Sequence, residues 1–194
     1  MKLMVAVPTH DYHHYEFTRC LIKLIQKLES EGIEYEVCMQ GGTLVYMARD
    51  DIAADAVNRK FDWVLWLDAD MVFDDDLFDR LLATGKQLVT GVYHARRPPY
   101  GSCIFYKVNP VDRVTTYPKE IFRIDGCGFG CMLTDVNVLA AVYRNFGNCF
   151  LPSPELGEDL EFCKRARKLG YKIWCEPNIQ CGHIGQLVIR PNMG

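Results

Sequence analysis

The run Trp63-Val64-Leu65-Trp66-Leu67 is the feature that most restricts the fold of this chain. Every position in it is apolar, as in a strand that is covered on both faces, whereas a strand with one face in water would alternate. The run ends at Asp68-Ala69-Asp70. A buried central strand with carboxylates at its carboxyl end indicates a sheet between two layers of helices, with polar chemistry at the strand ends.

Strand and helix patterns alternate through the first half of the chain. Short apolar runs predict strands at residues 2–7, 35–39, 63–67 and 87–93. Apolar residues at three- and four-residue spacing predict helices at residues 17–28, 47–59 and 77–82. This alternation with short connections predicts an α/β fold, with a mostly parallel central sheet and helices on both faces.

The second half is less regular. We expect strands at residues 103–108, 121–124 and 172–175, and helices at residues 136–146 and 158–169. Residues 125–130 contain three glycines and predict a tight turn, and residues 181–185 are expected to be irregular. We find no internal repeat or linker, so residues 1–194 are expected to form a single domain.

Charge and hydrophobicity exclude several classes of function. Lys plus Arg is 22 and Asp plus Glu is 25, so the net charge is -3 and there is no basic excess to hold a nucleic acid. No apolar run approaches the roughly eighteen residues of a transmembrane segment, and the apolar amino terminus stops at Pro8, too early for a signal peptide. Nine cysteines without such a signal indicate reduced thiols. We therefore expect a cytoplasmic protein.

Asp68 and Asp70 are the sharpest candidates for chemistry. Carboxylate oxygens suit Mn²⁺ or Mg²⁺, which bind through one or two carboxylates and complete their coordination with phosphate oxygens and water. The alternative is a pair of exposed aspartates that only turn the chain.

Glu158, Asp159 and His183 form a second set of candidates. The two acids open a predicted helix, where carboxylates are favoured by the helix dipole, but in a cleft they could also supply a general base. His183 is either a surface residue or a ligand for a divalent metal.

Three further patterns are weaker. Cys127, Cys131, Cys175 and Cys181 could form a zinc site with His183, but only the first pair has the usual spacing, so scattered buried thiols are favoured. Arg96-Arg97 precedes Pro98-Pro99 and could clamp a phosphate, or could belong to an ordinary solvated loop. The glycines of residues 126–130 do not lie between a strand and a helix, so they are a weak dinucleotide fingerprint.

The order of these motifs resembles GT-A-fold nucleotide-sugar glycosyltransferases, in particular the family-2-like group, over nearly the whole chain. The resemblance rests on Val5-Ala6-Val7-Pro8-Thr9, Met47-Ala48-Arg49-Asp50, the strand with Asp68-Ala69-Asp70, the glycine-rich residues 126–133, and Gly157-Glu158-Asp159-Leu160-Glu161-Phe162 with Gly170-Tyr171. It implies a Rossmann-like GT-A fold.

The resemblance also implies a function and a site. A hexosyltransferase-type enzyme would move a sugar from a nucleotide-diphosphate donor to an acceptor hydroxyl on a glycan, a lipid-linked molecule or a protein, with Mn²⁺ or Mg²⁺ as cofactor. Asp70 would bind the metal, Asp68 would contact ribose or metal, and His183 would complete the metal shell. Asp159, beside Glu158, would be the base of an inverting reaction. The nucleotide would be held at Pro8, Thr9 and Arg49.

Two other functions remain open. Asp68-Ala69-Asp70-Met71-Val72 also fits the motif of haloacid-dehalogenase-type phosphatases, in which Asp68 would be the nucleophile, although that motif normally follows the first strand. The chain could also be a non-catalytic module that binds a nucleotide sugar.

Asp50 stands where related sequences often have asparagine, which adds a negative charge near the expected nucleotide pocket.

Overall fold

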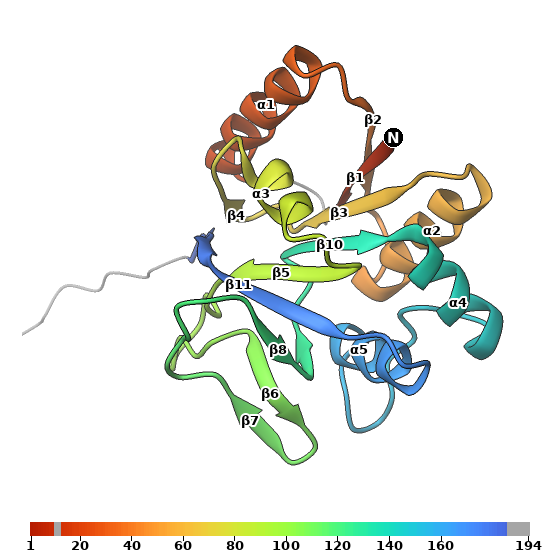
Figure 1. Cartoon of the computed structure of the whole chain (residues 1–194), viewed down its shortest axis with the longest axis vertical. Coiled ribbons are helices and arrows are strands. Elements are labelled where there is room, and N and C mark those ends of the chain that lie inside the picture. Colours follow the sequence, from red (N-terminus) through yellow and green to blue (C-terminus); the bar gives the residue numbers. More distant parts are fainter. Residues whose placement is uncertain (10–12, 186–194) are drawn as a thin grey trace, which may run out of the picture.

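The computed structural model describes residues 1–9 and 13–185, and within these residues a seven-stranded sheet forms the centre of the molecule (Figure 1). Its strands lie in the order β2-β1-β3-β10-β5-β11-β8. Their bounds are β1 Lys2–Pro8, β2 Glu34–Gln40, β3 Trp63–Leu67, β5 Leu88–Val92, β8 Phe122–Ile124, β10 Cys131–Asp135 and β11 Ile173–Gln180.

Most strands of this sheet point in one direction. β1 pairs in parallel with both β2 and β3, and β5 pairs in parallel with β11. β10 runs antiparallel between β3 and β5, and β8 is antiparallel to β11 at the edge. The predicted α/β fold with a mostly parallel central sheet is confirmed.

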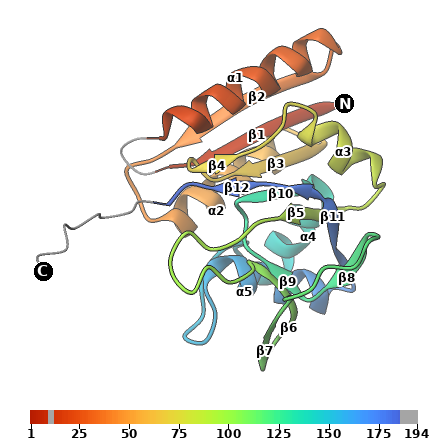
Figure 2. The same ribbon diagram turned by 90° about the vertical axis from the view of Figure 1, so that its left-hand side faces the viewer.

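Helices cover both faces of the sheet (Figure 2). Leu3, Val5 and Leu65 face one layer, where they pack with α1 and α3. Met4 and Trp66 face the other layer, with α2, α4 and α5. Because β1 and β3 are buried on both faces, residues 3–7 of β1 and the whole of β3 can be apolar at every position. The helices are α1 Tyr15–Ser30, α2 Val45–Asn58, α3 Leu77–Ala83, α4 Val136–Phe146 and α5 Glu158–Lys168.

Two small sheets complete the described residues. β6 (Ile104–Val108) pairs with β7 (Val111–Arg113) and with β9 (Gly126–Cys127). β4 (Met71–Val72) pairs with β12 (Gly182–His183), so the segment after the Asp-Ala-Asp motif is joined to the last described residues. None of the helices in the described ranges has the length and apolarity needed to cross a bilayer.

The differences from the sequence prediction concern short or antiparallel elements. The sequence prediction missed β10, because its five residues run directly into α4 without a turn signal. Residues 181–185 were expected to be irregular, and this is wrong at Gly182–His183, which form β12. A two-residue strand has no periodicity from which it could be predicted. β11 also continues to Gln180, beyond the expected end at residue 175.

Candidate functional site

Four candidate residues of the first half, Pro8, Thr9, Asp68 and Asp70, lie at the carboxyl ends of β1 and β3. These strands are parallel neighbours, so Pro8 and Thr9 at the end of β1 lie at the same edge of the sheet as Asp68 at the end of β3. Pro8 keeps its place in the ladder opposite Gln40, and the Thr9 amide donates to the Gln40 carbonyl at 2.9 Å. The edge of the sheet where open α/β folds bind ligands therefore carries the predicted nucleotide side of the site.

A buried arginine joins Asp68 to the acids of α5. Arg49 lies on the second turn of α2, and its side chain is only 3% exposed. Its guanidinium donates to Asp68 Oδ1 at 2.8 Å, to Glu158 Oε1 at 2.8 Å and to Asp159 Oδ1. Glu158 and Asp159 open α5, where the positive end of the helix also favours them. One cation thus holds three carboxylates from two distant segments of the chain.

This crowding changes the proton affinity of Asp159. Burial raises the pKa of Asp159 to about 7, and the charges of Glu158 and Asp68 add to the rise, while Arg49 and the Phe129 amide oppose it. That amide donates to Asp159 Oδ2 at 3.3 Å. A carboxyl group that titrates near neutral pH can both take up and release a proton under ordinary conditions.

Asp70 is the centre of a second cluster, formed by residues far apart in the sequence. His183 Nε2 lies 3.3 Å from Asp70 Oδ1, and Arg96 pairs with Asp70 Oδ2. The other ring nitrogen of His183, Nδ1, lies 2.8 Å from the His94 carbonyl oxygen, and this contact fixes the orientation of the imidazole ring. Burial by itself would raise the pKa of Asp70, but the hydrogen bond and charge of His183 and the charge of Arg96 outweigh it and lower the pKa.

Asp70 and His183 form a partial donor set for a divalent cation. A carboxylate oxygen and an imidazole nitrogen are ligands that Mn²⁺ accepts. Asp70 directly precedes β4 and His183 lies on β12, and the pairing of these two strands brings the side chains together. In the ranges 1–9 and 13–185, no three His, Cys, Asp or Glu side chains are gathered closely enough to hold a metal by themselves. The residues therefore fit a cation whose remaining ligands come from phosphate and water, as Mg²⁺ and Mn²⁺ sites often do.

The glycine-rich residues 126–130 pack against the site. A Cβ atom at Gly128 would overlap the phenol oxygen of Tyr93 and lie 3.6 Å from Asp159 Oδ2. The Tyr93 hydroxyl accepts a hydrogen bond from the Gly130 amide at 3.0 Å. These glycines therefore allow the backbone to approach Tyr93 and the catalytic candidate closely, which is a different use from a dinucleotide loop.

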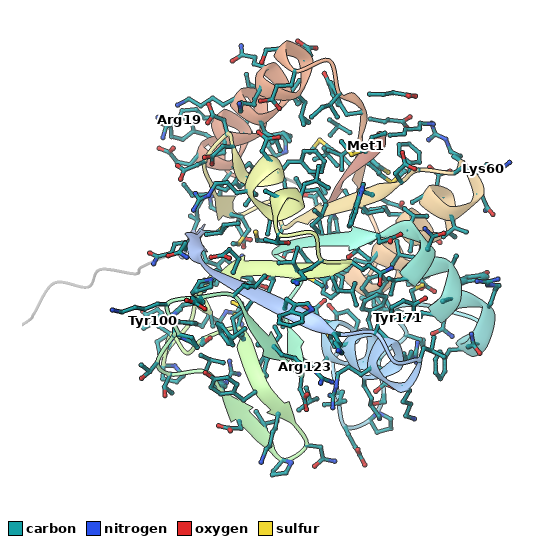
Figure 3. The ribbon with its side chains drawn as sticks, viewed as in Figure 1. Met1, Arg19, Lys60, Tyr100, Arg123 and Tyr171 are labelled. Carbon is teal, nitrogen blue, oxygen red and sulfur yellow. The ribbon has the colours of Figure 1, made fainter. Side chains whose placement is uncertain are left out.

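A cavity of about 630 Å³ opens beside the Asp70 cluster. Its size is that of a site for a small ligand. Tyr100 lies on the loop at its rim and projects outward (Figure 3). The lining includes Tyr93, His94, Arg96, Tyr100, Tyr117, Gln180 and His183.

Sequence reasoning missed several of the residues that shape this region. Tyr93 closes a predicted strand and was not singled out, because a buried tyrosine at a strand end has no signature of its own. The role of Arg49 as a buried counter-ion depends on the approach of α5 to α2, which no local pattern encodes. Asp50 is explained by packing, since its Oδ1 accepts hydrogen bonds from the amides of Cys149 and Phe150 at 2.6 and 2.9 Å.

Comparison with protein families and with curated sequences gives no match for this chain.

Solved structures do resemble it. A197 from STIV superposes with a TM-score of 0.66 at 19% identity, over 96% of this chain and 87% of A197. GalNAc-T7, solved with UDP, GalNAc and Mn²⁺, superposes with a TM-score of 0.62 at 14% identity, over 96% of this chain and 44% of GalNAc-T7. At sequence identities this low, the similarity supports a shared fold and nothing further. The chain has a GT-A-like fold, the fold of the glycosyltransferase GalNAc-T7.

Proposed function

We propose that this protein is a metal-dependent glycosyltransferase that moves a sugar from a nucleotide-diphosphate donor to an acceptor hydroxyl, with inversion at the sugar carbon. The observation that carries the proposal is the meeting of Asp68, Glu158 and Asp159 around Arg49, beside the Asp70 and His183 pair, at the ligand-binding edge of a GT-A-like sheet. This arrangement supports a donor side and an acceptor side within one site.

On the donor side, Asp70 and His183 would hold Mn²⁺ or Mg²⁺, with Asp68 in reach of the metal or the ribose. When bound, the cation would neutralise the charge that builds up on the leaving diphosphate. Pro8 and Thr9 at the end of β1 would line the nucleotide, and Arg49 would act there by fixing the orientation of Asp68.

On the acceptor side, Asp159 would take the proton of the acceptor hydroxyl. The oxygen then forms a bond to the anomeric carbon while the bond from that carbon to the diphosphate oxygen breaks, and the nucleoside diphosphate leaves with the electron pair. A pKa of about 7 suits this role, because a base works best when its pKa lies near the working pH. Arg49 holds the carboxylate in place through Oδ1.

The phosphatase alternative is less well supported. Its motif normally follows the first strand of the fold, whereas Asp68-Ala69-Asp70 follows β3, the third strand of this chain. The GT-A-like fold also favours the transferase.

The test separates binding from chemistry. Purified protein is incubated with Mn²⁺ and a panel of nucleotide sugars that includes UDP-GalNAc, and donor binding and nucleoside-diphosphate release are both measured. We expect Asp159→Asn to abolish turnover while leaving donor affinity nearly unchanged. We expect Asp70→Ala to lose the part of donor affinity that depends on metal.

The main contradiction would be a loss of donor affinity as the chief defect of Asp159→Asn, because that would place Asp159 on the donor side. Asp51→Ala serves as the matched control. Asp51 is an exposed aspartate of α2, and within the described residues its side chain forms a hydrogen bond only with Gln40. Hydrolysis of p-nitrophenyl phosphate that requires Asp68 would favour the phosphatase instead.

A further inference from the structure

Both carboxylate oxygens of Asp70 are engaged by cationic or potentially cationic side chains. His183 faces Oδ1 and Arg96 pairs with Oδ2. The Asp70 side chain is 13% exposed, so this is a largely desolvated carboxylate with little access for water. A divalent cation bound through Asp70 would compete with Arg96 for the same charge.

Arg96 is the partner that can leave. His183 is fixed by its strand pairing with Met71 and by the hydrogen-bond contact of its second ring nitrogen with the His94 carbonyl. The Arg96 side chain is 45% exposed and lines the cavity of about 630 Å³, so it has room to change rotamer.

The backbone around Arg96 is tied down, so the movement would be confined to the side chain. The Ala95 amide donates to the Gly101 carbonyl at 2.9 Å, and the Tyr100 amide donates to the Arg97 carbonyl at 2.8 Å. A Cβ atom at Gly185 would lie 3.0 Å from the Arg96 carbonyl oxygen, so the chain after β12 also presses closely against this residue.

We propose that Arg96 is a donor-binding residue that neutralises Asp70 in the free protein and moves to the diphosphate of the donor when the Asp70 carboxylate binds a cation. This inference rests on the proposed function. A guanidinium matches the paired oxygens of a diphosphate as well as those of a carboxylate, so the exchange keeps Arg96 paired in both states. The neighbouring Arg97 makes no side-chain hydrogen bond or ion pair within the described residues and, unlike Arg96, does not line the cavity, so it is the matched control.

The experiment measures the affinity of the free protein for Mn²⁺ by electron paramagnetic resonance, and its affinity for UDP in the presence of Mn²⁺ by calorimetry. For Arg96→Ala we expect Mn²⁺ alone to bind about two- to fivefold more tightly, because a half-exposed competitor has been removed. We expect UDP with Mn²⁺ to bind at least about tenfold more weakly, because charge-assisted hydrogen bonds are lost. Arg97→Ala should change neither, and Arg96→Lys should fall between.

Opposite changes in the two affinities are specific to the exchange. Mn²⁺ affinity of Arg96→Ala equal to or below that of the wild type would overturn it, and so would unchanged UDP affinity. Asp70→Ala separates the two proposals: if it loses Mn²⁺ binding while Arg96→Ala behaves as wild type, only the role of Arg96 fails. If Asp70→Ala binds Mn²⁺ as the wild type does, or if the wild type binds none, the metal-dependent function fails with it.

Discussion

Arg49 is a buried cation whose removal would leave three carboxylates facing one another. Its guanidinium is almost fully buried, whereas Asp68, Glu158 and Asp159 keep about a quarter of their side chains exposed, at 27%, 21% and 24%. Breaking a buried ion pair costs more than forming it gains, because the remaining charges stay desolvated. The arrangement therefore makes Arg49 a structural requirement of the site in addition to any contact with a ligand.

We expect Arg49→Met to lower the free energy of unfolding at pH 7.5 by about 3 kcal/mol. The loss should shrink as the pH is lowered, because protonation removes the uncompensated negative charges. Urea denaturation at pH 7.5 and pH 5.5 measures both effects. Arg59→Met is the control: Arg59 also pairs with two carboxylates, Glu36 and Asp55, but on the surface, so its loss should change stability little. Equal losses in the two variants would contradict the argument.

The proton affinity of Asp159 leads to a prediction about pH. The pKa of Asp159 is raised to about 7, and a base acts only when ionised. Activity should therefore be lost as the pH falls through about 7, by about tenfold for each further unit. The measurement is kcat/KM between pH 5.5 and pH 8.5, with circular dichroism to show that the protein stays folded. A profile that is flat from pH 6 to pH 8 would remove Asp159 from the role of base.

At the level of single residues, the sequence singles out the acids of the candidate site but not the cations that pair with them. The strand that ends at Asp68, and the helix start at Glu158 and Asp159, can be read locally. The packing of distant elements brings Arg49 to all three acids and Arg96 to Asp70, and no local pattern in the sequence shows it. For the cysteines, the sequence favoured scattered buried thiols over a zinc site, and Cys127, Cys131 and Cys175 are buried free cysteines.

Among the elements, the connection between β9 and β10, residues 128–130, packs closely against the candidate site. Tyr93, at the end of β5, fills the space that a side chain at residue 128 would need, and its hydroxyl accepts from the Gly130 amide. Burial raises the pKa of Tyr93 well above its ordinary value, so the phenol stays neutral. The absence of a side chain at Gly128 thus allows the Tyr93 hydroxyl and the Asp159 carboxylate to lie close to the backbone at residue 128.

We expect Gly128→Ala to lower stability by about 1–3 kcal/mol, because the new methyl group overlaps the Tyr93 hydroxyl. Tyr93→Phe removes that oxygen, so the double variant should recover part of the loss, with an interaction energy of at least about 0.5 kcal/mol. Thermal or urea unfolding of the two single variants and the double variant gives this energy. Gly101→Ala is the control, because its Cβ would make only ordinary contacts with Arg113, the nearest at 3.6 Å. Strict additivity would show that the two residues do not compete for space.

The elements that were predicted correctly share one physical property. β1, β3 and α4 each bury an apolar face against the sheet or form the sheet itself, so periodicity or continuous apolarity marks them. β4 and β12 are held by their pairing with each other, which comes from the fold as a whole. Since β12 carries His183 and β4 follows Asp70, the sequence could propose both side chains as ligands but could not show that they meet.

At the scale of the whole molecule, the candidate site joins the two halves of the chain. Asp68 and Asp70 follow β3, while His183 lies on β12 and Arg96 on the loop after β5. These segments lie far apart in the sequence and come together only in the folded state. A ligand that contacts both sides can therefore bind the native protein but not the unfolded chain, and it must raise the unfolding temperature.

We expect UDP with Mn²⁺, at about 100 times its dissociation constant, to stabilise the protein by about 2.7 kcal/mol, which corresponds to a rise of roughly 5–10 °C for a chain of this length. Differential scanning fluorimetry with Mn²⁺, with Mg²⁺ and with a chelator measures it. The rise should disappear with the chelator and in Asp70→Ala, and should persist in Asp159→Asn, because Asp159 is placed on the acceptor side. Persistence of the full rise in the chelator would show that nucleotide binds without metal, in which case Asp70 and His183 serve the fold through their contact between β4 and β12.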